Sequence, residues 1–213
     1  LRLLSPLGIK PSSIKPEVWY DEEELKFVQN LWGKYKLSEN RTIVLHPVCD
    51  IKEREWPSEH FEQLIRIFLK HDFHILLVGG KRDRAFLQRL IDNSGGSKDR
   101  VLNLAGITNL RETAAIVERS SLVIANDSCV AHIAASVGTP VVTIFGPSNP
   151  QRAAPYTEKK AIVRVNLPCS PCYRLYSGVI HCNRGLKCLR TITPELVYKE
   201  AINLLEKHSG WSS

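Results

Sequence analysis

The sequence of 213 residues lacks methionine altogether, even at position 1, and has no apolar stretch long enough to cross a bilayer. The longest apolar runs, at 73–78 and 140–145, have the length of strands. The first residues hold too short an apolar segment for a secretory signal. We therefore expect no membrane span, and the missing methionine indicates a fragment or a processed chain.

Blocks of like charge are also lacking. The chain carries 29 Lys and Arg against 22 Asp and Glu, a net charge of +7, yet no basic stretch is interleaved with aromatic residues. Proteins that bind single-stranded nucleic acids combine such stretches with stacking aromatic side chains. The scattered cations favour a small anionic substrate, with a phosphate-rich surface as a second possibility. With 43% hydrophobic residues, the chain can bury a globular core.

Strand-like and helix-like segments alternate from residue 41 onward. The expected strands are 42–46, 74–78, 122–126, 141–145 and 162–165. The expected helices are 21–36, 58–71, 82–92, 110–118, 128–137 and one that begins after Thr193-Pro194. This alternation predicts an α/β, Rossmann-like fold, with a mostly parallel sheet and helices on both of its faces.

The chain divides into two parts by composition. Residues 1–40 contain Pro6, Pro11 and Pro16 before the first helix, and are predicted to be an interdomain linker and helix. Residues 41–213 are predicted to form one ligand-binding domain, with a cysteine-rich loop at 168–190. We expect no internal repeat.

In open parallel sheets, ligands bind beyond the carboxyl ends of the strands. The most informative strand end is the segment 125–135, where Asn126-Asp127-Ser128 ends a strand and an alanine-rich helix follows at once. Asp127 and Ser128 are natural helix caps. The free amides of residues 128–130 could instead bind an anion, with His132 one helical turn further along. We favour anion binding here.

The loop 46–57 also lies at a strand end. Lys52 and Arg54 could reach a phosphate from it, the arginine through two parallel hydrogen bonds. Trp56 is expected to pack against the sheet. In a later loop Asp83 follows Gly79-Gly80, where its carboxylate could hold ribose hydroxyls or cap the next helix.

Taken together, these motifs resemble the bacterial lipopolysaccharide heptosyltransferase family, a glycosyltransferase family 9 group similar to ADP-heptose:LPS heptosyltransferase II. The resemblance covers nearly the whole chain from residue 41, in order. The matching segments are Trp56-Pro57, Asn103-Leu104-Ala105-Gly106 with Thr108 and Leu110, Asn126-Asp127-Ser128 with His132, 134–142, Phe145-Gly146-Pro147 and 167–172.

The resemblance implies the C-terminal, donor-binding half of a GT-B glycosyltransferase, with the N-terminal acceptor domain absent from this sequence. The implied reaction transfers heptose from ADP-heptose to the lipopolysaccharide inner core, with inversion and without a metal. No cofactor is required. The implied partners are the nucleotide-sugar donor, the lipid A-core acceptor and the missing domain.

The resemblance also assigns roles to residues. Arg54 would hold the diphosphate, Asp127 would bind the transferred sugar, and His132 would complete the catalytic group. Donor binding would further involve Lys52, Asp83, Thr108, Ser128, Cys129 and Val130. In the family, Gly usually stands at position 129, and small hydroxyl residues stand where this chain has Val48-Cys49.

The acceptor hydroxyl needs a general base, which the family supplies as a carboxylate of its N-terminal domain. We therefore expect this chain alone to bind donor without transferring sugar. The resemblance and the positive net charge imply a cytoplasmic protein peripheral to the inner membrane.

Four cysteines lie close together in the sequence, at 169, 172, 182 and 188, near His181. They predict either a structural zinc site at Cys169, Cys172, Cys182 and Cys188 or thiols that are reduced in the cell and become oxidised at most in a crystal. The five residues between Cys182 and Cys188 exceed the spacing of the usual close zinc pair. A cytoplasmic compartment argues against disulfides.

Two other functions stay open. The four cysteines and the cations Arg174, Arg184, Lys187 and Arg190 would suit a basic zinc-ribbon-like nucleic-acid-binding module. A non-catalytic nucleotide-sugar-binding protein would share the anion site. The zinc-ribbon alternative leaves Asp127, Ser128 and His132 unexplained, so we expect no nucleic-acid partner.

Overall fold

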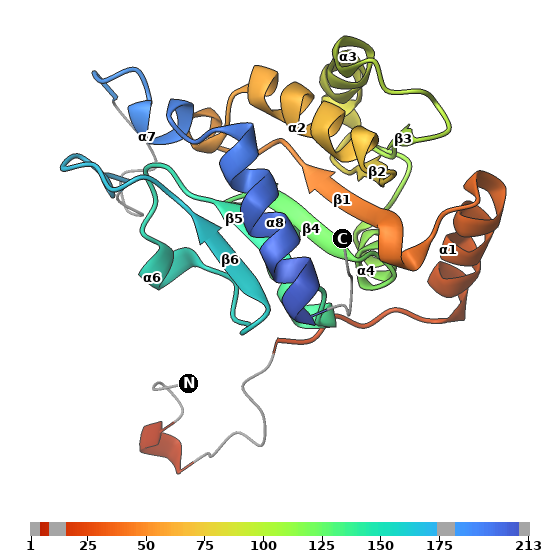
Figure 1. Ribbon diagram of the computed structural model, residues 1–213. Coiled ribbons are helices and arrows are strands. Elements are labelled where there is room, and N and C mark those ends of the chain that lie inside the picture. The colour runs from red at the N-terminus through yellow and green to blue at the C-terminus, as the bar shows by residue number, and fades with distance from the viewer. Residues whose placement is uncertain (1–4, 9–15, 174–181, 209–213) are drawn as a thin grey trace.

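The structure, a computed structural model, describes residues 5–8, 16–173 and 182–208. Its centre is a six-stranded sheet in the order β3-β2-β1-β4-β5-β6 (Figure 1). The strands are β1 (Thr42–His46), β2 (His74–Leu77), β3 (Val101–Asn103), β4 (Leu122–Asn126), β5 (Val141–Ile144) and β6 (Lys160–Val163). All neighbouring strands pair in parallel, which confirms the predicted Rossmann-like sheet.

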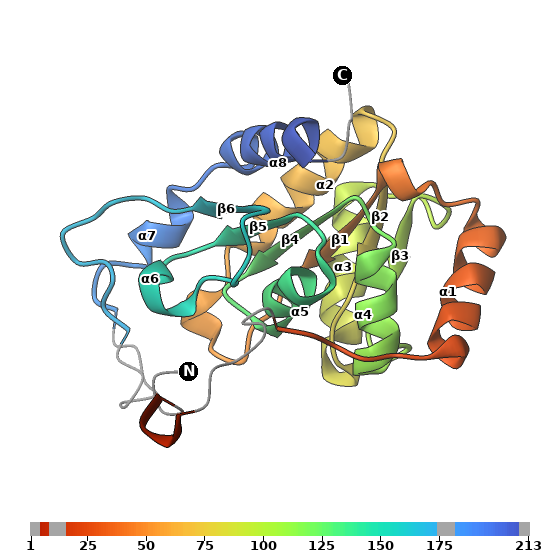
Figure 2. The same cartoon turned by 90° about the horizontal axis from the view of Figure 1, so that it is seen from below.

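Helices cover both faces of this sheet (Figure 2). The longer ones are α1 (Glu22–Tyr35), α2 (Ser58–Lys70), α3 (Arg84–Ser94), α4 (Leu110–Glu118), α5 (Cys129–Val137) and α8 (Pro194–His208), and the short ones are α6 (Pro150–Ala153) and α7 (Lys187–Arg190). Buried side chains of α2, α3 and α8 pack with Ile43 and Leu45 of β1, and those of α1, α4 and α5 pack with Val44. Because successive side chains of a strand point to opposite faces, β1 contributes to both cores.

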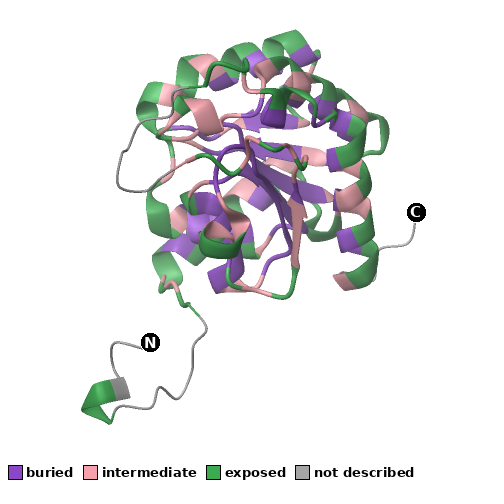
Figure 3. Ribbon diagram, turned by 90° about the vertical axis from the view of Figure 1, so that its left-hand side faces the viewer, coloured by how far each residue is buried: buried purple, intermediate pink, exposed green. Residues whose placement is uncertain are grey.

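Burial follows this layering. The central strands form a buried layer, the edge strand β6 is mostly half-buried, and the outer sides of the helices are exposed (Figure 3). All five residues of β1 and of β4 are buried, as expected for central strands covered on both faces. In the part of the chain that the structure describes, no helix is long and apolar enough to cross a membrane.

The first helix belongs to this folded unit. It begins after Asp21, whose side chain accepts a hydrogen bond from the amide of Glu23, and it covers the predicted segment 21–36. Its Val28 and Trp32 are buried against α4. The segment predicted as linker and helix thus contributes side chains to the core.

One strand is missing from the sequence prediction. β3 has only three residues and follows a stretch rich in Gly, Ser, Lys and Asp, so that it has no strand-like pattern of its own. It forms because Val101 and Leu102 pair with Ile75 and Leu76 of β2. At the other edge, β6 ends at Val163, two residues before the predicted end.

The strand order sets the position of the ligand crevice. From β1 the chain runs outward to β2 and β3, and then returns to the other side of β1 as β4. At such a reversal the loops after the two central strands separate, and ligands bind between them. The loops after His46 and Asn126 are therefore expected to line a crevice.

Candidate functional site

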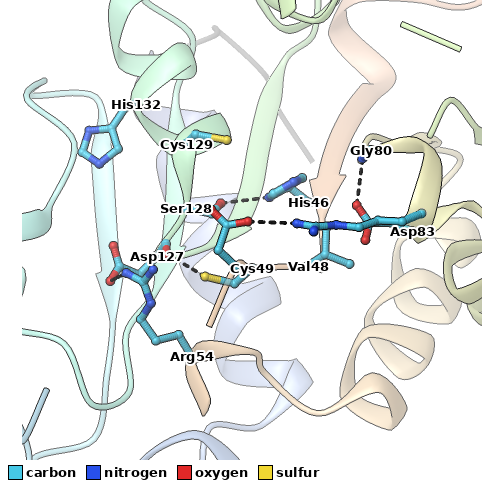
Figure 4. A pocket seen from close by; sticks show the side chains of 12 residues that line it. His46, Val48, Cys49, Arg54, Gly80, Asp83, Asp127, Ser128, Cys129 and His132 are labelled. Atoms are coloured by element: carbon cyan, nitrogen blue, oxygen red, sulfur yellow. Dashed lines mark hydrogen bonds and ion pairs between the residues drawn. The ribbon is translucent and has the colours of Figure 1, made fainter. Parts of the chain in front are cut away.

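A pocket of about 360 Å³ lies at this position, beyond the carboxyl ends of β1 and β4 (Figure 4). Its lining comes from loops that are far apart in the sequence. The lining residues are His46, Val48, Cys49, Asp50, Arg54, Gly80, Arg82, Asp83, Asp127, Ser128, Cys129 and His132. The chain thus brings together the loops after β1, β2 and β4.

Asn126 fixes the loop between β1 and α2 to the end of β4. Its fully buried side chain donates from Nδ2 to the carbonyl of Pro47 at 2.7 Å and accepts from the amide of Trp56 at 3.0 Å. These two contacts hold both ends of the loop. Trp56 is buried, as predicted, and its Nε1 donates to the carbonyl of Ile192 at 3.0 Å.

Inside the loop, the amide of Cys49 donates to Oε1 of Glu55 at 3.0 Å. Burial raises the pKa of this Glu55 carboxyl above its usual value. Cys49 also contacts the residue that follows β4, because its Sγ lies 3.4 Å from the carbonyl oxygen of Asp127. The loop is therefore braced internally as well as at its ends.

Arg54 pairs with Asp127 in this braced loop. Nη1 of Arg54 is 2.9 Å from Oδ2 of Asp127, and the two side chains are 19% and 6% exposed. The guanidinium also lies over the ring of Tyr173, with its central carbon 5.3 Å from the ring centroid. Among the residues that the structure describes, the buried Nε of Arg54 has no hydrogen-bond partner.

Ser128 and His46 form a second contact in the pocket. Nδ1 of His46 is 2.9 Å from Oγ of Ser128. Burial lowers the pKa of His46 from 6.5 to about 4, although the carboxylates of Asp83 and Asp50 oppose the shift. The imidazole is therefore neutral near pH 7. Sequence reasoning placed His46 at the end of a strand and the start of the loop 46–57, and gave it no role in the site.

One side of the pocket is formed by the loop after β2, which packs against the loop after β3. Oδ2 of Asp83 accepts the amide of Gly80 at 2.8 Å, so that this carboxylate caps its own turn and also lines the pocket. The amide of Gly106 donates to the carbonyl of Gly79 at 3.0 Å. A Cβ at Gly106, where φ is +68°, would lie 2.7 Å from Cα of Lys81, so the two loops touch.

Not every expected donor-binding residue lines the pocket. Lys52 is exposed and lies outside the lining, as does Thr108, whose Oγ1 is 3.0 Å from that of Thr113. Val130 is buried in the first turn of α5. By contrast, Cys129 and His132 are exposed and line the pocket.

The cysteine cluster flanks the site through Tyr173. The amides of Cys172 and Tyr173 both donate to the carbonyl of Pro147 at 2.9 Å, which ties the start of the cysteine-rich loop to the loop after β5. In the described part of the chain, no three Cys, His, Asp or Glu side chains are arranged to hold a metal ion. His181 and Arg174 lie outside the described residues. The geometry thus does not support the predicted zinc site.

Comparison with known proteins places this chain in a known family. Residues 3–178 match glycosyltransferase family 9, the heptosyltransferases. Lipooligosaccharide heptosyltransferase 2 of Haemophilus ducreyi is 27% identical over 197 residues, which are 86% of this chain and 52% of that protein.

Two solved structures show the same fold. The family 9 glycosyltransferase of Veillonella parvula superposes with a TM-score of 0.80 at 25% identity, over 97% of this chain and 58% of that one. The E. coli heptosyltransferase WaaC with ADP gives 0.62 at 18% identity, over 92% and 52%. The chain spans about half the length of the relatives that it matches, and it belongs to glycosyltransferase family 9, the heptosyltransferase family.

Proposed function

We propose that this chain is the donor-binding part of an enzyme that transfers heptose from ADP-heptose to the inner core of lipopolysaccharide. The observation that carries the proposal is the ion pair of Arg54 with Asp127, which lies in the pocket where α5 begins. Family membership supports the reaction class. The E. coli relative solved with ADP supports an adenine nucleotide as the ligand.

The pocket has the groups that a departing diphosphate needs. Breaking the bond between sugar and phosphate builds negative charge on the diphosphate. The Arg54 guanidinium and the first amides of α5 can stabilise that charge, and each such donor contributes about 2.7–4 kcal/mol in a site poor in water. We propose that these groups provide the stabilisation without a metal and that the transfer inverts the anomeric centre.

Asp127 has a different part in this proposal. Its Oδ2 is engaged by Arg54, and we propose that its Oδ1 accepts a hydrogen bond from a hydroxyl of the transferred sugar. The acceptor hydroxyl needs a general base. We assign the base to a group outside this chain.

Cys129, His132 and Asp83 line the pocket and stay proposed donor-binding residues, His132 near the transferred sugar and Asp83 near the ribose. The proposed acceptor is lipid A-core. Its membrane location and the net charge of +7 support peripheral contact with the cytoplasmic face of the inner membrane.

Calorimetric titration of the chain with ADP, UDP and a mixed-sequence oligonucleotide tests the proposal. We expect binding of ADP that is tighter than that of UDP, with no heptose transfer by the chain alone. If the chain binds the oligonucleotide and neither nucleotide, the proposal is wrong. If the chain transfers heptose, only the assignment of the base is wrong.

Structural zinc at the four cysteines stays a separate prediction, on which no step of the transfer depends. The four cysteines are free in the structure, so that their thiols can act as zinc ligands. Elemental analysis for zinc in freshly purified protein tests this prediction. Metal far below one equivalent per chain would contradict it.

A further inference from the structure

Ser128 occupies the N-cap position of α5 without capping the helix. Its backbone, at φ −150° and ψ 170°, is in the extended conformation that a cap residue adopts. Its side chain nevertheless makes no hydrogen bond to the first turn. At α1 and α4 the cap residues Asp21 and Asn109 do make that bond, to the amides of Glu23 and Glu112.

The hydroxyl of Ser128 is held elsewhere, because its Oγ contacts Nδ1 of His46 at 2.9 Å. His46 itself has little freedom to move. It is 7% exposed, ends the central strand β1 and pairs in register with Ala125 of β4. The contact therefore links the ends of two adjacent strands and fixes the direction of the hydroxyl (Figure 4).

This arrangement leaves helix donors open to a ligand. The first amides of any α-helix have no acceptor within the helix, and in α5 these are the amides of Cys129 and Val130. A serine at the N-cap normally accepts a hydrogen bond from the second or third amide. If the Ser128 hydroxyl turned to that position, it would compete with a phosphate oxygen for the amide of Val130.

We propose that His46 is a positioning residue for donor binding, which holds the Ser128 hydroxyl away from α5 so that the first amides of this helix stay available to the diphosphate. The inference rests on the proposed function and goes beyond it, because it gives a role to a residue that need not touch the donor. His46 acts here through Ser128.

Two substitutions of similar polarity separate this role from simple packing. In His46→Asn the side-chain amide stands where Nδ1 stood and can keep the contact with Ser128. In His46→Gln the amide lies further out, near the position of Nε2, and the contact is lost. We expect His46→Gln to weaken ADP binding about fivefold, as fits the strength of a helix cap, and His46→Asn to retain wild-type affinity.

A second pair of variants tests the competition directly. In the Ser128→Ala background no hydroxyl can compete for the amides. His46→Gln should therefore leave the ADP affinity of Ser128→Ala unchanged in a calorimetric titration. An equal loss in both backgrounds, or an equal loss in His46→Asn and His46→Gln, would overturn the proposal. Thermal unfolding of each variant shows that it is folded.

A readout without ligand keeps this test separate from the proposed function. Amide hydrogen exchange in the ligand-free chain should show slower exchange at Val130 in His46→Gln than in wild type, because the released hydroxyl now caps the helix. Unchanged exchange there would reject the role of His46 whether or not ADP binds. Slower exchange in a chain that does not bind ADP would reject the proposed function alone.

Discussion

Arg54 and Asp127 stand 73 positions apart in the sequence, yet Nη1 and Oδ2 are 2.9 Å apart in the pocket. One residue lies in the loop after β1 and the other directly follows β4. The ion pair therefore depends on the packing of these two strands side by side, and it joins the residues to which the proposed donor chemistry is assigned.

The first prediction concerns the stability that this pair provides. Arg54→Ala should lower the free energy of unfolding by about 3 kcal/mol, because it leaves the buried Asp127 carboxylate without its partner. Asp127→Ala should cost less, since the arginine side chain is 19% exposed against 6% for the aspartate. Urea denaturation measures both values.

A matched control is Arg82→Ala, which removes an exposed ion pair. In this pair Nη2 of Arg82 lies 3.2 Å from Oδ1 of Asp50. It should change the free energy of unfolding by less than about 0.5 kcal/mol. Equal losses in Arg54→Ala and Arg82→Ala would contradict the stabilising role of the buried pair.

The second prediction concerns the loop that carries Arg54. Asn126→Ala removes the partners of two backbone groups, the carbonyl of Pro47 and the amide of Trp56. We expect a loss of about 3 kcal/mol in the free energy of unfolding, since each buried unsatisfied group costs about 1–3 kcal/mol. Limited proteolysis should also cleave the loop 47–55 faster than in wild type.

Asn103→Ala serves as the control for this variant. Asn103 also bonds a carbonyl, from Nδ2 to Arg84 at 2.9 Å, but at an exposed position where water can replace it. We expect Asn103→Ala to lower the free energy of unfolding by less than half as much as Asn126→Ala. If cleavage in the loop 47–55 is the same in both variants, Asn126 does not fix that loop.

The third prediction is a pH dependence of stability due to His46. Burial lowers its pKa in the folded chain from 6.5 to about 4. Below pH 6.5 the unfolded chain therefore binds a proton that the folded chain takes up only near pH 4. His46 should destabilise the fold progressively as the pH falls from 6.5 to 4, by about 3 kcal/mol in all.

Urea denaturation of wild type and His46→Asn between pH 4 and pH 8 isolates this effect, because the other groups titrate alike in both proteins. These include His74, whose pKa is also lowered by burial and by the Arg100 charge. The difference in unfolding free energy should be constant above pH 7 and should shift in favour of His46→Asn at lower pH. A difference independent of pH would reject the account.

Local patterns predicted most of the fold because central parallel strands are buried on both faces and consist mainly of consecutive apolar residues. β1 and β4 are such strands, with polar residues only at their ends. β3 has three residues and depends on its pairing with β2, a tertiary contact that no pattern of three residues can reveal. The packing of α1 against α4 is likewise a contact between distant segments.

The site could be predicted where its residues follow a strand directly, as Asp127 and Ser128 do. Lys52 and Arg54 were expected to act together, but they lie in one 3-10 helix turn, Lys52–Arg54. Such a helix has three residues per turn, so side chains two positions apart point in different directions. His46 has one signal in the sequence, a polar residue at the end of an apolar strand.

The most direct test of a diphosphate at the start of α5 is an NMR titration of the chain with ADP. We predict that the backbone amides of Cys129 and Val130 and the side chain of Arg54 show the largest chemical-shift changes. The account would be contradicted if the largest chemical-shift changes lay far from this pocket, for instance between α2 and α8. It would also be contradicted if millimolar ADP caused no chemical-shift changes.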